Sequence, residues 1–275
     1  MSEAQWQLEG PAADLYQRYL VPTITIKWAE DLVVHAQPRA GETVLDVACG
    51  TGVVARLAAR RVAAGQVTGL DLNADMLAVA RSLPSEAQPV SWVEGSALDL
   101  PFRSESFDLV LCQLGLQFFP DQPKALGEMY RVLNNRGRVA LSVYSAIERT
   151  PGAHAFVQAL DDVLGDKASQ IKRGEHSFAD PAQLERLLRR AAFGAVEVHT
   201  VSQTIVFPSV LDYVRFQLLA TPMAILLADR AEHERHVIIS SISSKTASHA
   251  TPIMLDGGKF TFPQEAYVAL ARKSS

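Results

Sequence analysis

The sequence has few cysteines, no long apolar run and no strong excess of charge of either sign. Its 275 residues include two cysteines, Cys49 and Cys112, too few for the disulfide framework of a small secreted protein. No stretch approaches the roughly 18 consecutive apolar residues that a membrane-spanning helix requires. The formal net charge of -4 comes from interspersed charges, which argues against an extended basic surface for nucleic acid. We therefore expect a cytoplasmic protein that neither inserts stably into membranes nor binds nucleic acid.

Patterns typical of metal sites are also missing. His233, His236 and His249 fall in one helical stretch and share no zinc-like spacing with a carboxylate. We expect no bound metal.

Short apolar runs alternate with amphipathic helical patterns through most of the chain. The predicted strands are Thr43–Ala48, Gln66–Leu72, Val90–Gly95, Phe107–Gln113, Arg138–Tyr144 and Ala195–Phe207. The predicted helices between them are Gly52–Arg61, Ala74–Leu83, Gln122–Val132 and Pro181–Ala192. This alternation is typical of a doubly wound α/β fold with a mostly parallel sheet, and ligands of such sheets bind at the carboxyl ends of the strands.

The segments outside this pattern suggest four parts in the chain. Residues 1–40 are expected to form helical pieces, broken at Pro22, over the ligand site. Residues 41–207 form the core, and residues 208–258 form a helical insertion that serves as a lid or as the interface of a homodimer. Within the insertion, "HVIISSISS" is an ambiguous helix because it is rich in Ile and Ser. Residues 259–275 return to the sheet as its last strand.

The stretch "LDVACGTGVVARLA", Leu45–Ala58, identifies the ligand loop. Its Gly50-x-Gly52-x-x-Ala55 spacing fits dinucleotide binders, but alone it is a weak signal. Asp46 sharpens the choice, because a carboxylate beside the loop would repel the diphosphate of a nicotinamide or flavin cofactor. The same carboxylate suits S-adenosylmethionine, whose ammonium and sulfonium groups are positive.

Three further strand ends complete a predicted site. Asp71 lies 21 residues after Gly50, a reach suited to accepting hydrogen bonds from ribose hydroxyls. The stretch "EGSALDLPF" would place Gly95, Ser96 and Ala97 along an adenine ring. The end of "FDLVLCQLGLQFF" places Gln113, Gly115 and Leu116 where a methyl donor and an acceptor would meet.

Taken in order, these motifs together with "GLDLNADML" and "EMYRVLNNRGRVALSVY" resemble class I S-adenosylmethionine-dependent methyltransferases, in particular those similar to the ubiquinone and menaquinone C-methyltransferases. The resemblance implies a Rossmann-like, seven-stranded sheet whose last strand is antiparallel. It covers about Leu15–Tyr144 well and is unspecific after Pro208. Two departures are Ser96, where the family usually has an adenine-binding aspartate, and "NNRG", which replaces the family's Lys-Pro-Gly-Gly turn.

The motifs and the resemblance together predict the residues of the cofactor site. They are Asp46, Ala48, Cys49, Gly50, Thr51, Gly52, Asp71, Leu72, Asn73, Met76, Gly95, Ser96, Ala97, Gln113, Leu116, Tyr16 and Tyr19. Asn73 can serve at the same time as a helix N-cap.

The predicted activity is methyl transfer to carbon, oxygen or nitrogen of a small or medium, partly apolar acceptor, with S-adenosylhomocysteine as product. In-line transfer depends largely on positioning, so no obvious catalytic residue is required. His176, Tyr144 and Tyr19 are the candidates. His176 is either a general base or, as the more favoured interpretation, a solvated loop residue. Two rival functions stay open: a non-catalytic S-adenosylmethionine-binding regulatory protein, and an NAD(P)-dependent oxidoreductase, which Asp46 disfavours.

Overall fold

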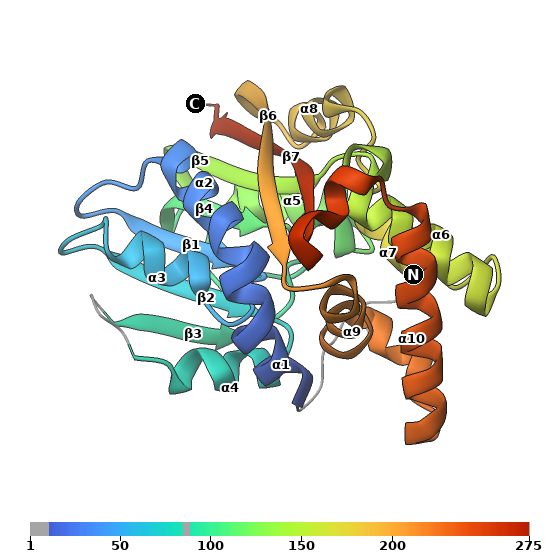
Figure 1. Ribbon diagram of the computed structural model, residues 1–275. Helices are drawn as coiled ribbons and strands as arrows, with labels where there is room; N and C mark the ends of the chain where they lie inside the picture. Colours follow the sequence, from blue (N-terminus) through green and yellow to red (C-terminus); the bar gives the residue numbers. More distant parts are fainter. Residues whose placement is uncertain (1–10, 85–88, 275) are drawn as a thin grey trace.

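The protein is organised around a seven-stranded sheet, seen here in a computed structural model that describes residues 11–84 and 89–274 (Figure 1). The strand order is β3-β2-β1-β4-β5-β7-β6, and β7 alone runs in the direction opposite to the other six strands. The strands are β1 (Thr43–Val47), β2 (Gln66–Asp71), β3 (Val90–Glu94), β4 (Phe107–Gln113), β5 (Leu133–Tyr144), β6 (Phe193–Phe207) and β7 (Phe260–Lys273). This arrangement confirms the predicted doubly wound α/β fold with an antiparallel last strand.

The strand order reverses between β1 and β4, which creates the crevice where ligands of such sheets bind. Both strands are almost continuously apolar, because helices cover both of their faces. Val44, Leu45 and Val47 of β1 are fully buried, as are residues 109–112 of β4. The crevice is therefore built on strands that are buried on both faces.

Helices pack on both faces of the sheet and beyond its carboxyl edge (Figure 1). The α-helices are α1 (Pro11–Leu15), α2 (Ile26–Ala36), α3 (Val53–Ala59), α4 (Ala74–Ser82), α5 (Gln122–Val132), α6 (Pro151–Leu164), α7 (Gln170–Glu175), α8 (Pro181–Arg190), α9 (Val210–Ala220) and α10 (Glu232–His249). A π-helix, η2 (Tyr16–Thr25), joins α1 to α2, and 3₁₀ turns occur at η3 (Leu116–Phe118), η4 (Ile147–Arg149), η5 (Pro222–Leu227) and η6 (Pro252–Gly258).

Two local predictions were wrong. Pro22 does not break the first helical segment, because it lies inside η2, where the wider π-type turn accommodates a residue that lacks a backbone N–H. The "NNRG" stretch does not precede the fifth strand but belongs to it, since β5 begins at Leu133. The chain bends within this stretch at Arg136, whose φ is 69°.

The ambiguous "HVIISSISS" stretch is helical and forms part of α10. Two buried hydroxyl groups of α10 bond within the helix: Ser243 of this stretch donates to the carbonyl of Ile239, and Thr246, just beyond it, donates to that of Ile242, each across 2.8 Å. This back-bonding is how serine and threonine are accommodated inside helices.

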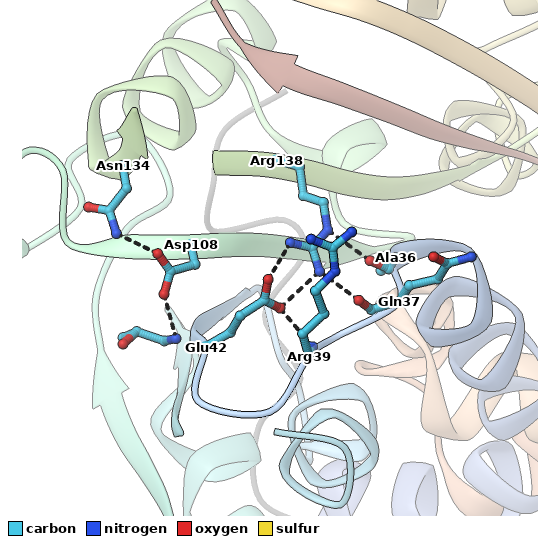
Figure 2. Close-up of polar contacts among 8 residues, drawn as sticks. Ala36, Gln37, Arg39, Glu42, Asp108, Asn134 and Arg138 are labelled. Carbon is cyan, nitrogen blue, oxygen red and sulfur yellow. Dashed lines mark hydrogen bonds and ion pairs between the residues drawn. The ribbon is translucent and has the colours of Figure 1, made fainter. Parts of the chain in front are cut away.

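Arg138 anchors α2 to the sheet at the edge opposite the ligand crevice (Figure 2). Its guanidinium donates to the carbonyl oxygens of Ala36 at 2.9 Å and Gln37 at 2.7 Å, and it pairs with both carboxylate oxygens of Glu42 at 2.7 and 2.9 Å. The Arg138 hydrogen bonds and charge outweigh the opposing effect of burial and lower the pKa of Glu42. The helix that leads out of η2 is thus fixed at its far end.

Candidate active site

A cavity of about 250 Å³ opens at the carboxyl ends of the parallel strands. One half is formed by the loops after β1, β2 and β3, and the other by η2, the segment after β4, and helices α7 and α9. The cavity is continuous from the glycine loop to the helical insertion. Ligands bound in its two halves would therefore be neighbours.

Two carboxylates, one buried and one partly buried, organise the glycine loop. Asp46 at the end of β1 is 1% exposed, and its Oδ2 accepts a hydrogen bond from the backbone N–H of Ala55 at 2.9 Å. Asp71 at the end of β2 accepts from the N–H of Gly50 at 2.7 Å and from that of Asn73 at 2.9 Å. Asn73 in turn caps α4 through its side-chain oxygen. These bonds hold the loop of β1 against the end of β2.

The loop backbone is left-handed at three places, with φ of 56° at Ala48, 54° at Gly50 and 83° at Gly52. The two glycines serve different purposes. A Cβ added to Gly50 would meet no atom within 4 Å, so this face of the loop is open. A Cβ at Gly52 would lie 2.1 Å from the ring of Trp92, so Gly52 is required by packing.

The electrostatics of this half favour a cationic ligand. Burial raises the pKa of Asp46 to about 8, and burial also raises the pKa of Asp71. Within the described part of the chain neither carboxylate has an ion-pair partner; Arg56, the nearby base, donates instead to the carbonyl of Thr51 at 2.8 Å. The Thr51 hydroxyl is buried without a hydrogen-bond partner among these residues. Two unpaired acids, an orphaned hydroxyl and an open glycine face fit a ligand that carries positive charge and polar groups.

Most of the predicted cofactor-site residues line the cavity. They are Asp46, Ala48, Cys49, Gly50, Thr51, Asp71, Leu72, Asn73, Met76, Gly95, Ala97, Gln113 and Tyr16. Gln113 also ties the end of β4 to η2, because its Nε2 donates to the carbonyl of Thr25 at 2.9 Å.

Four predicted cofactor residues lie outside the cavity lining. Gly52 packs on Trp92, and Leu116 is buried in the core, so that Leu114 and Gly115 line the cavity instead. The Ser96 hydroxyl accepts from the N–H of Leu98 at 3.1 Å within its own turn. Tyr19 is 49% exposed on the outer face of η2. The loops that the sequence singled out all reach the cavity, but sequence position did not show which side chains face inward.

His176 is a buried residue behind the cavity wall. It is 5% exposed, so the interpretation as a solvated loop histidine was wrong. Its Nδ1–H donates to the carbonyl of Ser145 at 2.8 Å, and its ring stacks on that of Tyr144 at 5.0 Å between centroids. Burial lowers its pKa to about 3. The imidazole is therefore neutral and supports Tyr144, which does line the cavity.

Aromatic and aliphatic side chains with a few polar groups form the second half of the cavity. Its walls include Leu20, Ile24, Phe118, Phe119, Tyr213, Phe262 and a few polar groups, Lys172, Glu175, Gln217 and Gln264. Trp28 donates to Gln264 at 2.7 Å. These residues come from elements distant in sequence.

Known proteins resemble this chain in both sequence and fold. Residues 45–141 match the family model described as a methyltransferase domain. A demethylmenaquinone methyltransferase of Listeria welshimeri is 36% identical over 201 residues, which cover 68% of this chain and 85% of that protein. The chain belongs to the class I S-adenosylmethionine-dependent methyltransferases. A 2-phytyl-1,4-naphtoquinone methyltransferase of Nostoc is 37% identical over 42% of this chain, and the match spans about half of that relative, 52%.

A solved structure supports the same assignment. A candidate methyltransferase from Bacillus halodurans superimposes with a TM-score of 0.61 and 25% identity, covering 90% of this chain and 99% of that one. The methyltransferase is thus related to quinone methyltransferases. Among the described helices, none is long and apolar enough to cross a membrane.

Proposed function

We propose that this methyltransferase binds S-adenosylmethionine on the glycine-loop half of the cavity and methylates a small, largely apolar aromatic acceptor in the other half. The observation that carries the proposal is the continuity of the cavity between the two halves. The names of the relatives, which are methyltransferases of quinones, support an aromatic acceptor.

The chain's own residues would hold the donor as follows. Asp46 would lie beside the positive methionine end, and Asp71, pre-positioned by its bonds to the loop, would accept from ribose hydroxyls. Gly95 and Ala97 would flank the adenine. When bound, S-adenosylmethionine supplies an electrophilic methyl group on a sulfonium.

The protein then contributes positioning and exclusion of water. Loss of positive charge in methyl transfer is favoured by a dry, weakly polar surrounding, and the aromatic walls beside Leu114 and Gly115 provide one. Much of the rate of such a displacement comes from holding the reacting atoms in line.

We further propose that residues 208–258 act as a lid over the acceptor half. Tyr213 and Gln217 of α9 and Pro222 of η5 line the cavity, which supports a lid more directly than a homodimer interface. Cys49 and Cys112 are buried, free thiols, which supports work in a reducing compartment such as the cytosol.

Isothermal calorimetry with S-adenosylhomocysteine tests the donor site, with NADH as the matched control. We expect micromolar binding of S-adenosylhomocysteine and none of NADH. Transfer of labelled methyl from S-adenosylmethionine to a 2-alkyl-1,4-naphthohydroquinone then separates an enzyme from a regulatory binder. Folded protein that binds NADH but not S-adenosylhomocysteine would overturn the proposal.

A further inference from the structure

A buried ion pair stands out in the largely apolar acceptor half of the cavity. Lys172 and Glu175, both on α7, are each 5% exposed, and the Lys172 Nζ lies 2.5 Å from Glu175 Oε2. Both side chains line the cavity. Helix α7 packs against η3, the turn that follows β4, and against η5 of the insertion. The pair thus lies at the junction of the sheet edge and the lid.

Stability alone gives little reason for this pair. Removing two charges from water costs several kcal/mol per ion, and apolar replacements of buried pairs are often neutral or stabilising. Only one oxygen of the Glu175 carboxylate accepts a hydrogen bond. Lys172 donates to Oε2, and within the part of the chain that the structure describes Oε1 has no donor. One carboxylate oxygen is therefore available to a ligand.

The surroundings of Glu175 are polar groups that are neutral at pH 7. Burial, and after it the negative charge of Glu175, raises the pKa values of Tyr144 on β5 and Tyr213 on α9. Tyr16 on η2 faces Tyr144, and burial raises its pKa too. His176, the next residue, is neutral. Lys172 is consequently the only described cation that contacts Glu175.

A second observation points to a ligand that carries a hydrogen-bond donor. Gln217 on α9 is 3% exposed and lines the same half of the cavity. Its side-chain oxygen has no partner among the described residues. A buried acceptor without a donor costs about 1–3 kcal/mol, which a bound hydroxyl or N–H would offset.

Resting on the proposed function, we propose that the acceptor is a hydroxyaromatic compound and that Glu175 is its general base, with Lys172 stabilising the resulting oxyanion. The O–H bond of the acceptor breaks, its proton passes to Glu175, and its electron pair stays on the acceptor. As Glu175 becomes neutral, Lys172 is released to pair with the oxyanion. The charge of this half of the cavity stays unchanged through the step.

Methyl transfer to the ionised acceptor then completes the reaction. The acceptor gains the methyl group on its oxygen or on a ring carbon and becomes neutral, while the donor sulfonium becomes a neutral thioether. After O-methylation, Glu175 loses its proton to water. After C-methylation, the ring C–H proton goes to water and Glu175 returns its proton to the oxygen.

Binding tests the acceptor class without relying on turnover. In the presence of S-adenosylhomocysteine and without oxygen, the wild type should bind 1,4-naphthohydroquinone at least tenfold more tightly than its dimethyl ether, which has no hydroxyl to donate. Equal binding of the two probes, or binding of neither by protein that still binds S-adenosylhomocysteine, would overturn the inference and leave the donor site standing. Absence of S-adenosylhomocysteine binding would overturn the proposed function itself.

A pH profile tests the role of Glu175. Glu175→Gln should lower kcat about 10²- to 10⁴-fold at pH 7, and the loss should shrink as pH approaches the pKa of the acceptor, about 10 for a simple phenol, because an ionised acceptor needs no base. S-adenosylhomocysteine affinity should change less than twofold. A deficit that is equal at every pH, or a kcat within threefold of wild type, would contradict a base. The double variant Lys172→Met/Glu175→Leu removes both charges and is expected to fold at least as stably as wild type. A loss of kcat in this folded variant would therefore come from the missing base and not from structural damage.

Discussion

The carboxylate of Asp71 at the end of β2 accepts a hydrogen bond from the backbone N–H of Gly50 across 2.7 Å, so the second strand holds the ligand loop of the first. Asp71→Ala should weaken S-adenosylhomocysteine binding about 10- to 100-fold, since both the loop contact and the acceptor for ribose are lost. Asp71→Asn, which keeps the shape but can accept from fewer N–H groups, should lose less. Calorimetry on folded variants measures both, and unchanged affinity in the alanine variant would contradict the assignment.

The two loop glycines should respond differently to an added side chain. Gly50→Val should cost about 1–2 kcal/mol of unfolding free energy from its left-handed backbone, yet weaken S-adenosylhomocysteine binding at least tenfold, because its side chain enters open cavity space. Gly52→Ala should cost about 2–5 kcal/mol, since its Cβ meets Trp92 as well. Urea unfolding distinguishes the two substitutions by the free energy of unfolding that each one costs. As a control, Trp92→Leu should recover part of the Gly52→Ala loss, and failure to do so would contradict the packing role.

The sequence predicts the glycine-loop half of the site well because that half is local. Asp46, Gly50 and Asp71 each follow a strand whose apolar run is visible in the sequence, and parallel strands bring their carboxyl ends to one edge. The direction in which a side chain points is harder to read from the sequence. Tyr16 faces the cavity, whereas Tyr19, three residues on, is half exposed. The π-helical geometry of η2 alters which side chains share a face, and residue spacing does not reveal it.

The polar groups of the acceptor half could not be predicted, for a different reason. Lys172 and Glu175 lie on a six-residue helix with no apolar periodicity, and Gln217 comes from α9, more than forty residues later. Only tertiary packing of α7 against η3 and η5 places these elements around one cavity. His176 illustrates the same limit, because its polar loop sequence suggests solvent while the fold buries it.

Arg138 should stabilise the fold without affecting the ligand site. Arg138→Met leaves Glu42 and the carbonyls of Ala36 and Gln37 without their partner, and should lower the free energy of unfolding by about 3–5 kcal/mol. Arg138→Lys keeps the charge but cannot span all three groups, so about 1–2 kcal/mol should be lost. Denaturant unfolding measures both changes. S-adenosylhomocysteine affinity of the folded variants should match wild type, and a large drop in affinity would mean that this edge is coupled to the site.

Asp46 should couple ligand binding to pH. Its pKa of about 8 in the free protein, raised by burial, means that near neutral pH a ligand whose ammonium group pairs with it displaces a proton from it. Affinity for S-adenosylhomocysteine should therefore rise by up to about tenfold per pH unit below pH 8 and level off above it. Calorimetry at pH 7 in buffers of different ionisation enthalpy should detect proton release. Asp46→Asn should bind more weakly and lose this dependence.

The raised pKa of Asp46 also makes the free energy of unfolding depend on pH, in the opposite direction to ligand affinity. Because the folded protein holds the Asp46 proton up to about pH 8, whereas the unfolded chain releases it near pH 4, folding binds a proton over that interval. The contribution of Asp46 to the free energy of unfolding must then fall as pH rises from about 4 to about 8. Subtracting the pH dependence of Asp46→Asn from that of wild type, measured by urea unfolding without ligand, isolates it. A difference that stays flat or rises with pH would show that Asp46 is ionised in the free protein, and the proton release on binding would then be absent as well.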